Sequence, residues 1–383
     1  MRVTDYELFA VPPRWLFLKL TTSDGAVGWG EPILEGRTRT VRAAVTDLME
    51  DFLLGEDPTE IERHWQRCYR GGHYRGGPVL MSAIAGIDQA LWDIKGRQFD
   101  APVYELLGGK ARDRVQVYQW VGGEQPSDVA ADAKRAVADG YSVIKMMISS
   151  RAHRREGTEL VGVAQQRLSA VREAVGDSVE IAFDCRGRIG KARVARLASV
   201  LEPYDVLFLE EPVLPENSDS LAGVAPTMEI PVATGQRLFS RWDFAPLLEN
   251  DAVGFVQPEI THAGGISEVK KIATMAEAYD VSVAPKSFVG PISLAASLQI
   301  DFCTPNVALQ EQGLDVQNTT DNELLKYLSD PSTFEYEDGY LHAPEKPGLG
   351  IDIDESYVRE QAEKEIRWQT PTWHNGDGSI AEW

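Results

Sequence analysis

A short apolar run that ends in two acids decides the fold: residues 206–212 read VLFLEEP. Its length and its β-branched and aromatic content are typical of a strand buried on both faces. A similar run at 179–183 ends at Asp184, which lies 26 residues ahead of Glu210. Because parallel strands need a crossover of a dozen or more residues, this spacing indicates one βα unit between the two acids.

Runs of the same kind recur on both sides of this pair. Helical patterns such as 267–279 separate them, and strands alternating with helices predict a parallel sheet. Eight such units predict a closed α/β fold, a TIM-type (β/α) barrel. The predicted strands are 115–121, 142–146, 179–183, 206–209, 232–233, 253–256, 281–284 and 307–309.

The residues ahead of the barrel follow another pattern. Apolar runs at 15–20 and 26–29 flank Ser23-Asp24-Gly25, an Asp-Gly turn that predicts a hairpin. An apolar stripe then predicts a helix over 79–97, with Leu80, Ile84, Ile87, Leu91 and Ile94 on one face.

These patterns divide the chain into three parts. We predict an N-terminal α+β capping domain over 1–112 and the barrel over 113–330. The segment 331–383 has no strand–helix rhythm, and we expect it to return to the capping domain and complete it.

Composition narrows the choice of partner. The 383 residues include 59 acidic and 38 basic side chains, for a net charge of −21. Such a field repels phosphate, so we expect neither nucleic acid nor an anionic membrane as a partner. Only 12 of the basic residues are lysine. An acidic, lysine-poor surface is typical of proteins from a salt-rich, halophilic cytoplasm; the alternative is an acidic protein of an ordinary one.

The expected location of the protein in the cell rests on targeting signals and cysteine patterns. No apolar run reaches the roughly 20 residues of a membrane span, and the N-terminus MRVTDYELFA has no signal-peptide pattern. Cys68, Cys185 and Cys303 form neither a disulfide framework nor a zinc pattern. We expect a cytoplasmic protein.

Polar residues follow the later predicted strands in phase. Successive members are 26, 26, 23, 27 and 25 residues apart, about one βα unit each, and carboxyl ends of barrel strands meet at one mouth. We therefore expect a shared pocket, with oxygen donors suited to Mg²⁺. The series is Asp184, Glu210, Gln236, Glu259, Lys286 and Glu311.

Strand alternation assigns directions to the neighbours of these residues. Arg186 shares the side of Asp184, whereas Cys185 points outward and is not a nucleophile. Glu211 points away from Glu210, and we expect it to pair with a barrel lysine or arginine, with Lys145 as the leading candidate.

The chain resembles the galactonate dehydratases of the enolase superfamily, in its mandelate racemase-like branch. The resemblance covers nearly the whole chain. The stretches that carry it are PRW at 13–15, GWGEP at 28–32, YRGGP at 74–78, MSAIAGID at 81–88, EEPV at 210–213, HAGGI at 262–266, LQEQ at 309–312 and AEW at 381–383.

The resemblance implies a small-molecule sugar acid as partner and Mg²⁺ as cofactor. The metal holds the substrate carboxylate, the proton beside it is removed, and the 3-hydroxyl leaves as water to give a 2-keto-3-deoxy acid. The resemblance also implies a symmetric homo-oligomer.

The resemblance further implies three acidic metal ligands, and Asp184, Glu210 and Gln236 stand at their positions. Arg186 and Lys286 replace the two expected histidines. Glu259 replaces the supporting aspartate, Met147 replaces an asparagine of the second strand, and Glu311 is retained.

These substitutions change the expected chemistry. Gln236 keeps an oxygen donor but removes a negative charge, and Arg186 adds a permanent positive one. Two arrangements are open: a weakened Mg²⁺ site, or the Arg186 guanidinium forked onto Asp184 and Glu210. If Glu259 contacts Lys286, the two residues form an ion pair. Our catalytic candidates are Lys286, Glu259, Arg186, Glu311 and Lys145.

The sequence leaves three functions open. The first is a lyase acting on a sugar acid, with Lys286 as base. The second is another reaction of the same enediolate, such as epimerisation by Lys286. The third is a catalytically inactive homologue that binds an acid sugar. Four further residues are weaker candidates: His73, Tyr74 and Arg75 as a loop over the mouth or a structural turn, and His262 as a helix cap or rim residue. His153 is expected in solvent.

Overall fold

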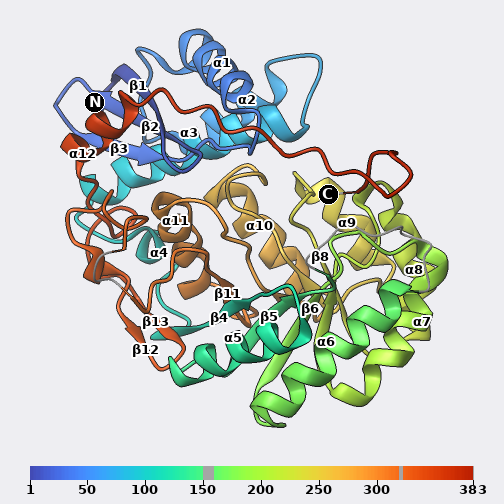
Figure 1. Ribbon diagram of the computed structural model, residues 1–383. Helices are drawn as coiled ribbons and strands as arrows, with labels where there is room; N and C mark the ends of the chain where they lie inside the picture. The colour runs from blue at the N-terminus through green and yellow to red at the C-terminus, as the bar shows by residue number, and fades with distance from the viewer. Residues whose placement is uncertain (150–158, 319–321, 383) are drawn as a thin grey trace.

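The computed structural model describes residues 1–149, 159–318 and 322–382. A smaller N-terminal domain lies across one end of a larger α/β body (Figure 1). Its sheet is antiparallel in the order β1 (Val3–Val11), β2 (Trp15–Thr22) and β3 (Val27–Gly30). The predicted hairpin is confirmed, and Gly25 at its turn has φ 86°, a conformation that glycine adopts without steric cost.

Helices cover one face of this sheet. The predicted helix at 79–97 is confirmed as α3, and it lies directly on β3: a Cβ on Gly30 would come within 1.9 Å of the Gly86 carbonyl oxygen. The helices of this domain are α1 (Thr38–Leu48), a π-helical turn (Met49–Leu53), α2 (Ile61–Arg70), α3 (Pro78–Gln98) and α4 (Val103–Leu106).

The larger body is a run of parallel strands in sequence order. Seven of the eight predicted strands overlap the observed ones; the eighth, predicted at 307–309, begins at Gln310, and Val307 makes only an isolated bridge. The strands are β4 (Arg114–Val121), β5 (Val143–Met147), β6 (Glu180–Asp184), β7 (Val206–Glu210), β8 (Val232–Thr234), β9 (Phe255–Val256), β10 (Ser282–Val283) and β11 (Gln310–Glu311).

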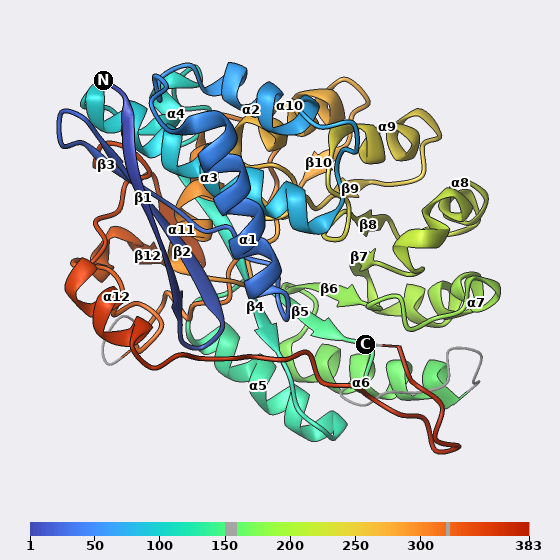
Figure 2. The ribbon, with the colours of Figure 1, turned by 90° about the horizontal axis from the view of Figure 1, so that it is seen from above.

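Helices follow the strands and lie outside them, as Figures 1 and 2 show. The α-helices are α5 (Pro126–Ala138), α6 (Glu159–Val175), α7 (Lys191–Leu201), α8 (Leu221–Val224), α9 (Arg241–Glu249), α10 (Ile266–Glu277) and α11 (Pro291–Phe302). Short 3₁₀ turns occur at Glu202–Tyr204, Pro215–Ser220, Ala225–Thr227 and Pro331–Thr333.

The two ends of the strand run approach each other through the last strand. β11 pairs in parallel with β4, with Glu311 opposite Tyr118. Just ahead of β11, the Ala308 amide donates to the Val283 carbonyl of β10 at 2.8 Å. The interior holds one buried cluster: Tyr118, Val143, Ala182, Phe208, Ala233, Ala284 and Leu309. A ring of inward side chains from successive strands is the interior of a (β/α) barrel.

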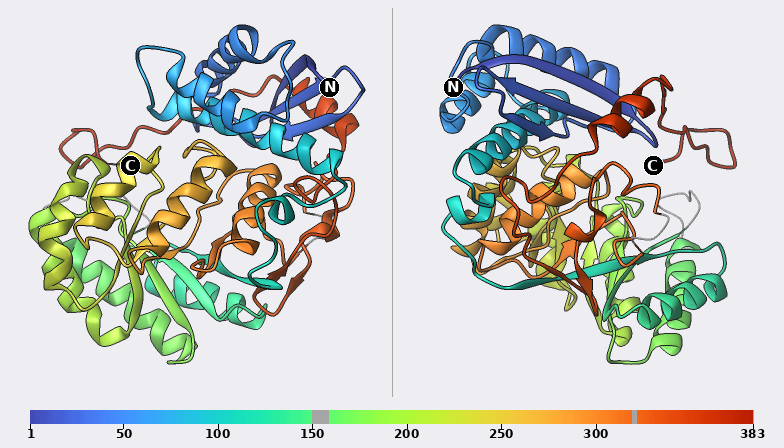
Figure 3. Two further views of the ribbon diagram at one scale, coloured as in Figure 1. Left: turned by 180° about the vertical axis from the view of Figure 1, so that it is seen from behind. Right: turned by 90° about the vertical axis from the view of Figure 1, so that its left-hand side faces the viewer.

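The chain after residue 330 serves both parts of the molecule. β12 (Tyr336–Glu337) and β13 (Tyr340–His342) form a hairpin whose second strand pairs antiparallel with β4. α12 (Glu355–Ala362) returns to the N-terminal sheet, where Arg359 pairs with Glu7 at 2.7 Å. The remaining tail crosses to the barrel side, as Figures 2 and 3 show. The domain limits 1–112, 113–330 and 331–383 stay a prediction.

Buried polar contacts join the capping domain to the barrel. Glu31, in the GWGEP stretch, accepts from the backbone amides of Gly290 and Ser293 at 2.7 and 3.0 Å. The Trp65 indole donates to the Gly264 carbonyl at 2.8 Å. Within the described residues, no helix is both long and apolar enough to span a bilayer.

Candidate active site

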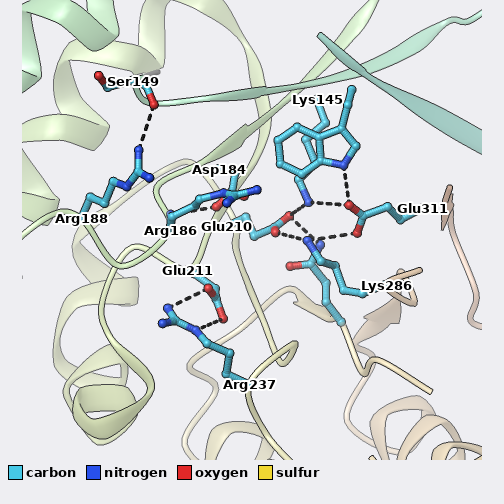
Figure 4. A network of polar contacts seen from close by, with 12 residues as sticks. Lys145, Ser149, Asp184, Arg186, Arg188, Glu210, Glu211, Arg237, Lys286 and Glu311 are labelled. Carbon is cyan, nitrogen blue, oxygen red and sulfur yellow. Dashed lines mark hydrogen bonds and ion pairs between the residues drawn. The ribbon is translucent and has the colours of Figure 1, made fainter. Parts of the chain in front are cut away.

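Four buried charges from distant parts of the chain meet at the carboxyl ends of the strands (Figure 4). Lys145 comes from β5, Glu210 from β7 and Glu311 from β11, and Lys286 follows β10. Each is at most 1% exposed. Lys286 Nζ lies 2.5 Å from Glu210 Oε1 and 3.0 Å from Glu311 Oε2. Lys145 Nζ pairs with Glu210 Oε2 and lies 3.5 Å from Glu311 Oε1. The two ammonium groups and two carboxylates therefore alternate.

Glu210 is the most fully bonded member of this cluster. Besides both lysines, the Gln257 side-chain amide donates to its Oε2 at 2.9 Å. Burial alone raises the pKa of a carboxyl group, but Lys145 and Lys286 outweigh burial and lower the pKa of Glu210 to about 2. Although burial opposes it, Glu210 and Glu311 raise the pKa of Lys286 above its usual range. Lys286 is thus an ammonium ion in this arrangement. For Lys145, burial lowers the pKa, against the charges of Glu210 and Glu311.

Trp120 forms a wall of the site. Its indole nitrogen donates to Glu311 Oε1 at 2.5 Å. Lys145 Nζ, Lys286 Nζ and the Arg186 guanidinium lie 4.5, 5.6 and 5.5 Å from its ring. Such contacts favour cations through the negative face of the ring. Trp120 therefore helps to hold three positive charges in one pocket.

Asp184 stands beside Glu210 in strand register but has different partners. Its Oδ1 accepts from the Arg186 amide at 2.8 Å, and its Oδ2 lies 3.5 Å from Arg186 Nε. Burial, and then the Glu210 charge, raise the pKa of Asp184 to about 6. The guanidinium thus lies against Asp184, while both lysines and Gln257 bond Glu210.

Glu211 points away from this cluster, as strand alternation predicts. Arg237 Nη2 and Nε donate to its two oxygens at 2.8 and 3.2 Å. The prediction of a basic partner is confirmed, but Lys145 as that partner is wrong, because the inward direction of β5 brings Lys145 to Glu210 and Glu311.

Glu259 is buried beside Lys286 without an ion pair to it among the described residues. Its Oε1 accepts from the Thr261 and Ser293 hydroxyls at 3.1 and 3.4 Å. Burial, and then the charge of Glu311, raise the pKa of Glu259 to about 8. The side-chain contact that would have made Glu259 and Lys286 an ion pair is not among the described ones; Lys286 is engaged by Glu210 and Glu311.

The cluster opens into a cavity of about 780 Å³ between the two domains. Both domains and the C-terminal tail contribute to its wall: Arg14 and Glu35 from the first, Trp368 and Thr370 from the last. The candidates Arg186, Gln236, Glu259, Lys286 and Glu311 line it as well. Four members of the strand-end series, Gln236, Glu259, Lys286 and Glu311, therefore line one pocket. Asp184, Glu210 and Lys145 lie behind its described wall.

Comparison with known proteins places the chain in a family. Residues 12–108 match the N-terminal domain model of mandelate racemase and muconate lactonizing enzyme, and residues 128–357 match the enolase C-terminal domain-like model. The chain belongs to the enolase superfamily. The expected family and fold class are thereby confirmed.

Relatives align over the whole chain. A D-galactonate dehydratase of Ralstonia nicotianae is 48% identical over 383 residues, covering all of both chains, and one of Pectobacterium atrosepticum is 45% identical over the same span. A solved mandelate racemase/muconate lactonizing enzyme from a Sulfitobacter species is 33% identical, with a TM-score of 0.87 over 94% of this chain and 95% of that one.

Members of the enolase superfamily typically use Mg²⁺, and the donor set of this chain fits such an ion poorly. Within residues 1–149, 159–318 and 322–382, no three His, Cys, Asp or Glu side chains are arranged to hold a metal. Both oxygens of Glu210 are already engaged by side-chain cations: Lys286 donates to Oε1, and Lys145 forms an ion pair with Oε2. Gln236 lines the cavity and makes no hydrogen bond to Asp184 or Glu210 in the described part of the chain.

The weaker candidates fall into three groups. His262 lines the cavity and lies 3.2 Å from the Ser82 hydroxyl, and burial lowers its pKa to about 4, so the ring is neutral. His73, Tyr74 and Arg75 are exposed and are not among the described residues that line the cavity. His153 lies outside the described residues.

Several site residues were not predicted from the sequence. Trp120 is the penultimate residue of the first barrel strand, β4, whereas the predicted strand-end series begins with Asp184 on the third. Gln257 lies two residues ahead of Glu259, and Arg237 directly follows Gln236. Strand-end position was therefore a usable signal for these three. Arg14 and Trp368 reach the cavity from outside the barrel, where no such signal exists.

Proposed function

We propose that this enolase superfamily member eliminates water from an acid sugar, as a galactonate dehydratase does. Two facts support the proposal: the end-to-end similarity to D-galactonate dehydratases and a cavity lined by Arg186 and Lys286. Fixed cations suit a ligand whose charge is a carboxylate. The observation that carries the proposal is the buried ammonium of Lys286 at the cavity wall.

The cations of the site take the carboxylate in this scheme. Lys286 and Arg186 receive its two oxygens, and Lys145 adds positive charge from behind. Removal of the proton beside the carboxylate spreads negative charge onto those oxygens. Positive groups already fixed in a desolvated site stabilise this charge without reorganising.

Glu259 is the group we assign to the proton, in place of Lys286. Lys286 holds its proton against two carboxylates, so it is a poor base. Glu259 has a pKa raised to about 8, and both of its hydrogen bonds from described residues go to Oε1. Its Oε2 then accepts the proton from carbon and returns it to the leaving 3-hydroxyl. A single group suffices when both bonds break on one face.

A direct assay tests the function. The protein is incubated with D-galactonate and a panel of other aldonates, with and without Mg²⁺, and the 2-keto-3-deoxy acid is measured. We expect product from at least one aldonate, and its loss in Glu259→Gln. Glu277→Gln, an exposed acid at the end of α10, is the matched control. No product from any aldonate under either condition contradicts the proposal.

A second candidate is favoured by the doubly paired Lys286: a non-catalytic protein that binds an acid sugar. The same cations hold the ligand, and no group needs to titrate. A thermal shift by an aldonate without product formation identifies this case. Epimerisation is distinguished by solvent deuterium that enters the sugar acid beside its carboxylate without loss of water.

We also infer from the family that the chain forms a symmetric homo-oligomer and works in the cytoplasm. Light scattering on the purified protein measures the assembly. A strictly monomeric protein at working concentration contradicts that part of the proposal.

A further inference from the structure

The acidic residues at the strand ends are paired with a side-chain cation, the Lys286 ammonium. A divalent ion of the Mg²⁺ type needs several oxygen ligands with lone pairs to spare, chiefly carboxylates. Glu210 Oε1 lies 2.5 Å from Lys286 Nζ, and Glu210 Oε2 accepts from Gln257 and pairs with Lys145. Both oxygens of Glu210 are thus already engaged by cations and a donor amide.

Charge leads to the same conclusion. Three carboxylates, those of Asp184, Glu210 and Glu311, face three cations, those of Lys145, Lys286 and Arg186. The cluster is nearly closed to solvent, with Arg186 the most exposed member at 26%. A divalent ion added to this balanced set would place two uncompensated positive charges in a desolvated site, which is strongly unfavourable.

We propose that the Lys286 ammonium replaces the divalent cation at Glu210 and binds the carboxylate of the acid ligand directly, so that ligand binding does not require a metal. The class of ligand, an acid sugar, rests on the proposed function. The replacement of the metal rests on the donor set alone.

Geometry gives Lys286 the means to do this. An ammonium has three N–H donors. One donates to Glu210 Oε1, and Glu311 Oε2 forms an ion pair with the same nitrogen at 3.0 Å. Donor capacity is thus left for a ligand in the cavity that Lys286 lines. Lys145 occupies the opposite side of Glu210, and the Trp120 ring lies 4.5 and 5.6 Å from the two ammonium nitrogens. These contacts keep the ammonium in one position, as coordination bonds keep a metal ion.

A Mn²⁺ titration followed by electron paramagnetic resonance tests the first part, because bound and free Mn²⁺ differ in signal. We expect the wild-type chain to leave Mn²⁺ free. The variant Arg186→His/Gln236→Glu/Lys286→His restores the third acidic ligand and replaces both cations by the expected histidines, and we expect it to bind one Mn²⁺. Because this variant carries three changes in a buried site, the wild-type titration is decisive by itself. Stoichiometric Mn²⁺ binding by the wild type that Glu210→Gln abolishes overturns the inference.

Thermal shifts by aldonates test the second part. We expect the same shift in EDTA as in excess Mg²⁺. Lys286→Gln should weaken the apparent affinity by about tenfold or more, the usual weight of a charge-assisted hydrogen bond. The control Lys326→Gln, at an exposed lysine, should leave it unchanged. A shift that appears only with Mg²⁺, or no shift with any aldonate, overturns carboxylate binding by Lys286.

The two proposals fail separately. Binding in EDTA without product leaves this inference standing and removes the dehydratase. Product that forms only with Mg²⁺ keeps the dehydratase and overturns this inference. Product in EDTA supports both.

Discussion

Glu210 and Glu259 are both buried carboxyl groups at strand ends, yet their pKa values lie on opposite sides of the ordinary one. Glu210 touches two ammonium groups, and its pKa falls to about 2. Glu259 accepts from the Thr261 and Ser293 hydroxyls, and burial, followed by the charge of Glu311, raises its pKa to about 8. Burial raises the pKa of both groups; it prevails at Glu259, whereas the adjacent Lys145 and Lys286 reverse it at Glu210. A pair of carboxyls with separated pKa values supplies one permanent anion and one group that can exchange a proton.

A pH profile tests the role of Glu259. Acting as a base requires the ionised form, so kcat/KM should rise about tenfold per pH unit below 8 and level off above it. The charged or titratable groups around Glu259 are Lys286, Glu311, His262 and, across Ser293, Glu31. Of these, burial holds the His262 pKa near 4, so His262 does not titrate in this range. Burial raises the pKa of Glu31 to about 8 as well, so the profile is also measured in Glu31→Gln, where the rise should persist. A profile that is flat from pH 6 to 8 contradicts the assignment.

Asp301 gives a stability prediction away from the cavity. It is fully buried on α11, and neither carboxyl oxygen has a hydrogen-bond partner among the described residues. Burial raises its pKa well above the ordinary 3.8, against the effect of Arg112. The folded state therefore favours the protonated form, and the free energy of unfolding falls as pH rises above about 4.

Asp301→Asn removes this titration. Relative to wild type, the variant should gain stability progressively from pH 4 to pH 8, by about 1–3 kcal/mol at the upper end. Urea unfolding at several pH values measures the difference. Asp113→Asn, an exposed aspartate with 93% of its side chain accessible, is the control. A difference that stays constant with pH contradicts the prediction.

For single residues, the sequence predicted which way a side chain points better than it predicted which residue that side chain contacts. Alternation along a strand placed Glu211 away from Glu210, and Asp184 and Glu210 toward one mouth. It favoured Lys145 as the partner of Glu211 and did not identify Arg237, because the partner depends on how far each strand end is staggered from the next. Stagger is a tertiary property that no local pattern encodes.

Elements bring these residues together through register. Asp184 lies opposite Glu210, and Glu311 lies opposite Tyr118. A slip of one residue in either pairing would turn the carboxylates away from the mouth. The strong apolar runs of β6 and β7 made both strands predictable. The hairpin of β12 and β13 was missed because its strands are two and three residues long and its turn, Asp338-Gly339, has no apolar runs beside it.

The C-terminal tail is an element whose role the sequence did not suggest. Trp368 lines the cavity, and the Arg14 guanidinium lies 5.4 Å from its ring. Removing the ring in Trp368→Ala should weaken aldonate binding by about 2- to 30-fold, the range of a cation–π contact and the wall it forms. Isothermal titration measures the affinity.

Trp373→Ala is the matched control for this prediction. This tail residue also stacks on an arginine, with Arg188 at 4.8 Å from its ring, but it does not line the cavity. It should leave affinity unchanged. Equal loss in the two variants would mean that the tail acts by general anchoring rather than through Trp368.

At the scale of the whole molecule, fold and family were predictable from the sequence. The charge pairing within the site was predictable only in part. Eight apolar runs at regular spacing sufficed for the barrel, and the strand-end series sufficed for the location of the site. Arg186, Gln236 and Lys286, which replace two histidines and one acid expected from the family, indicated an altered site. Lys286 pairs with Glu210, which Lys145 also contacts, and not with Glu259. This choice of partner follows only from the three-dimensional distances.

Net charge gives the prediction that belongs to the entire chain. A charge of −21 on 383 residues repels itself in the folded state. Salt screens exposed charges over about 10 Å at 0.1 M and over shorter distances at higher salt, but it hardly reaches buried pairs such as Lys286–Glu210. The melting temperature should therefore rise by several degrees, about 1–2 kcal/mol in stability for a chain of this size, as KCl increases from 0.1 M to molar concentration. Glycine betaine at equal osmolality is the uncharged control, because it strengthens burial without screening charge. If betaine stabilises as much as KCl does, the stabilisation comes from preferential exclusion, and the repulsion between surface carboxylates is too weak to matter.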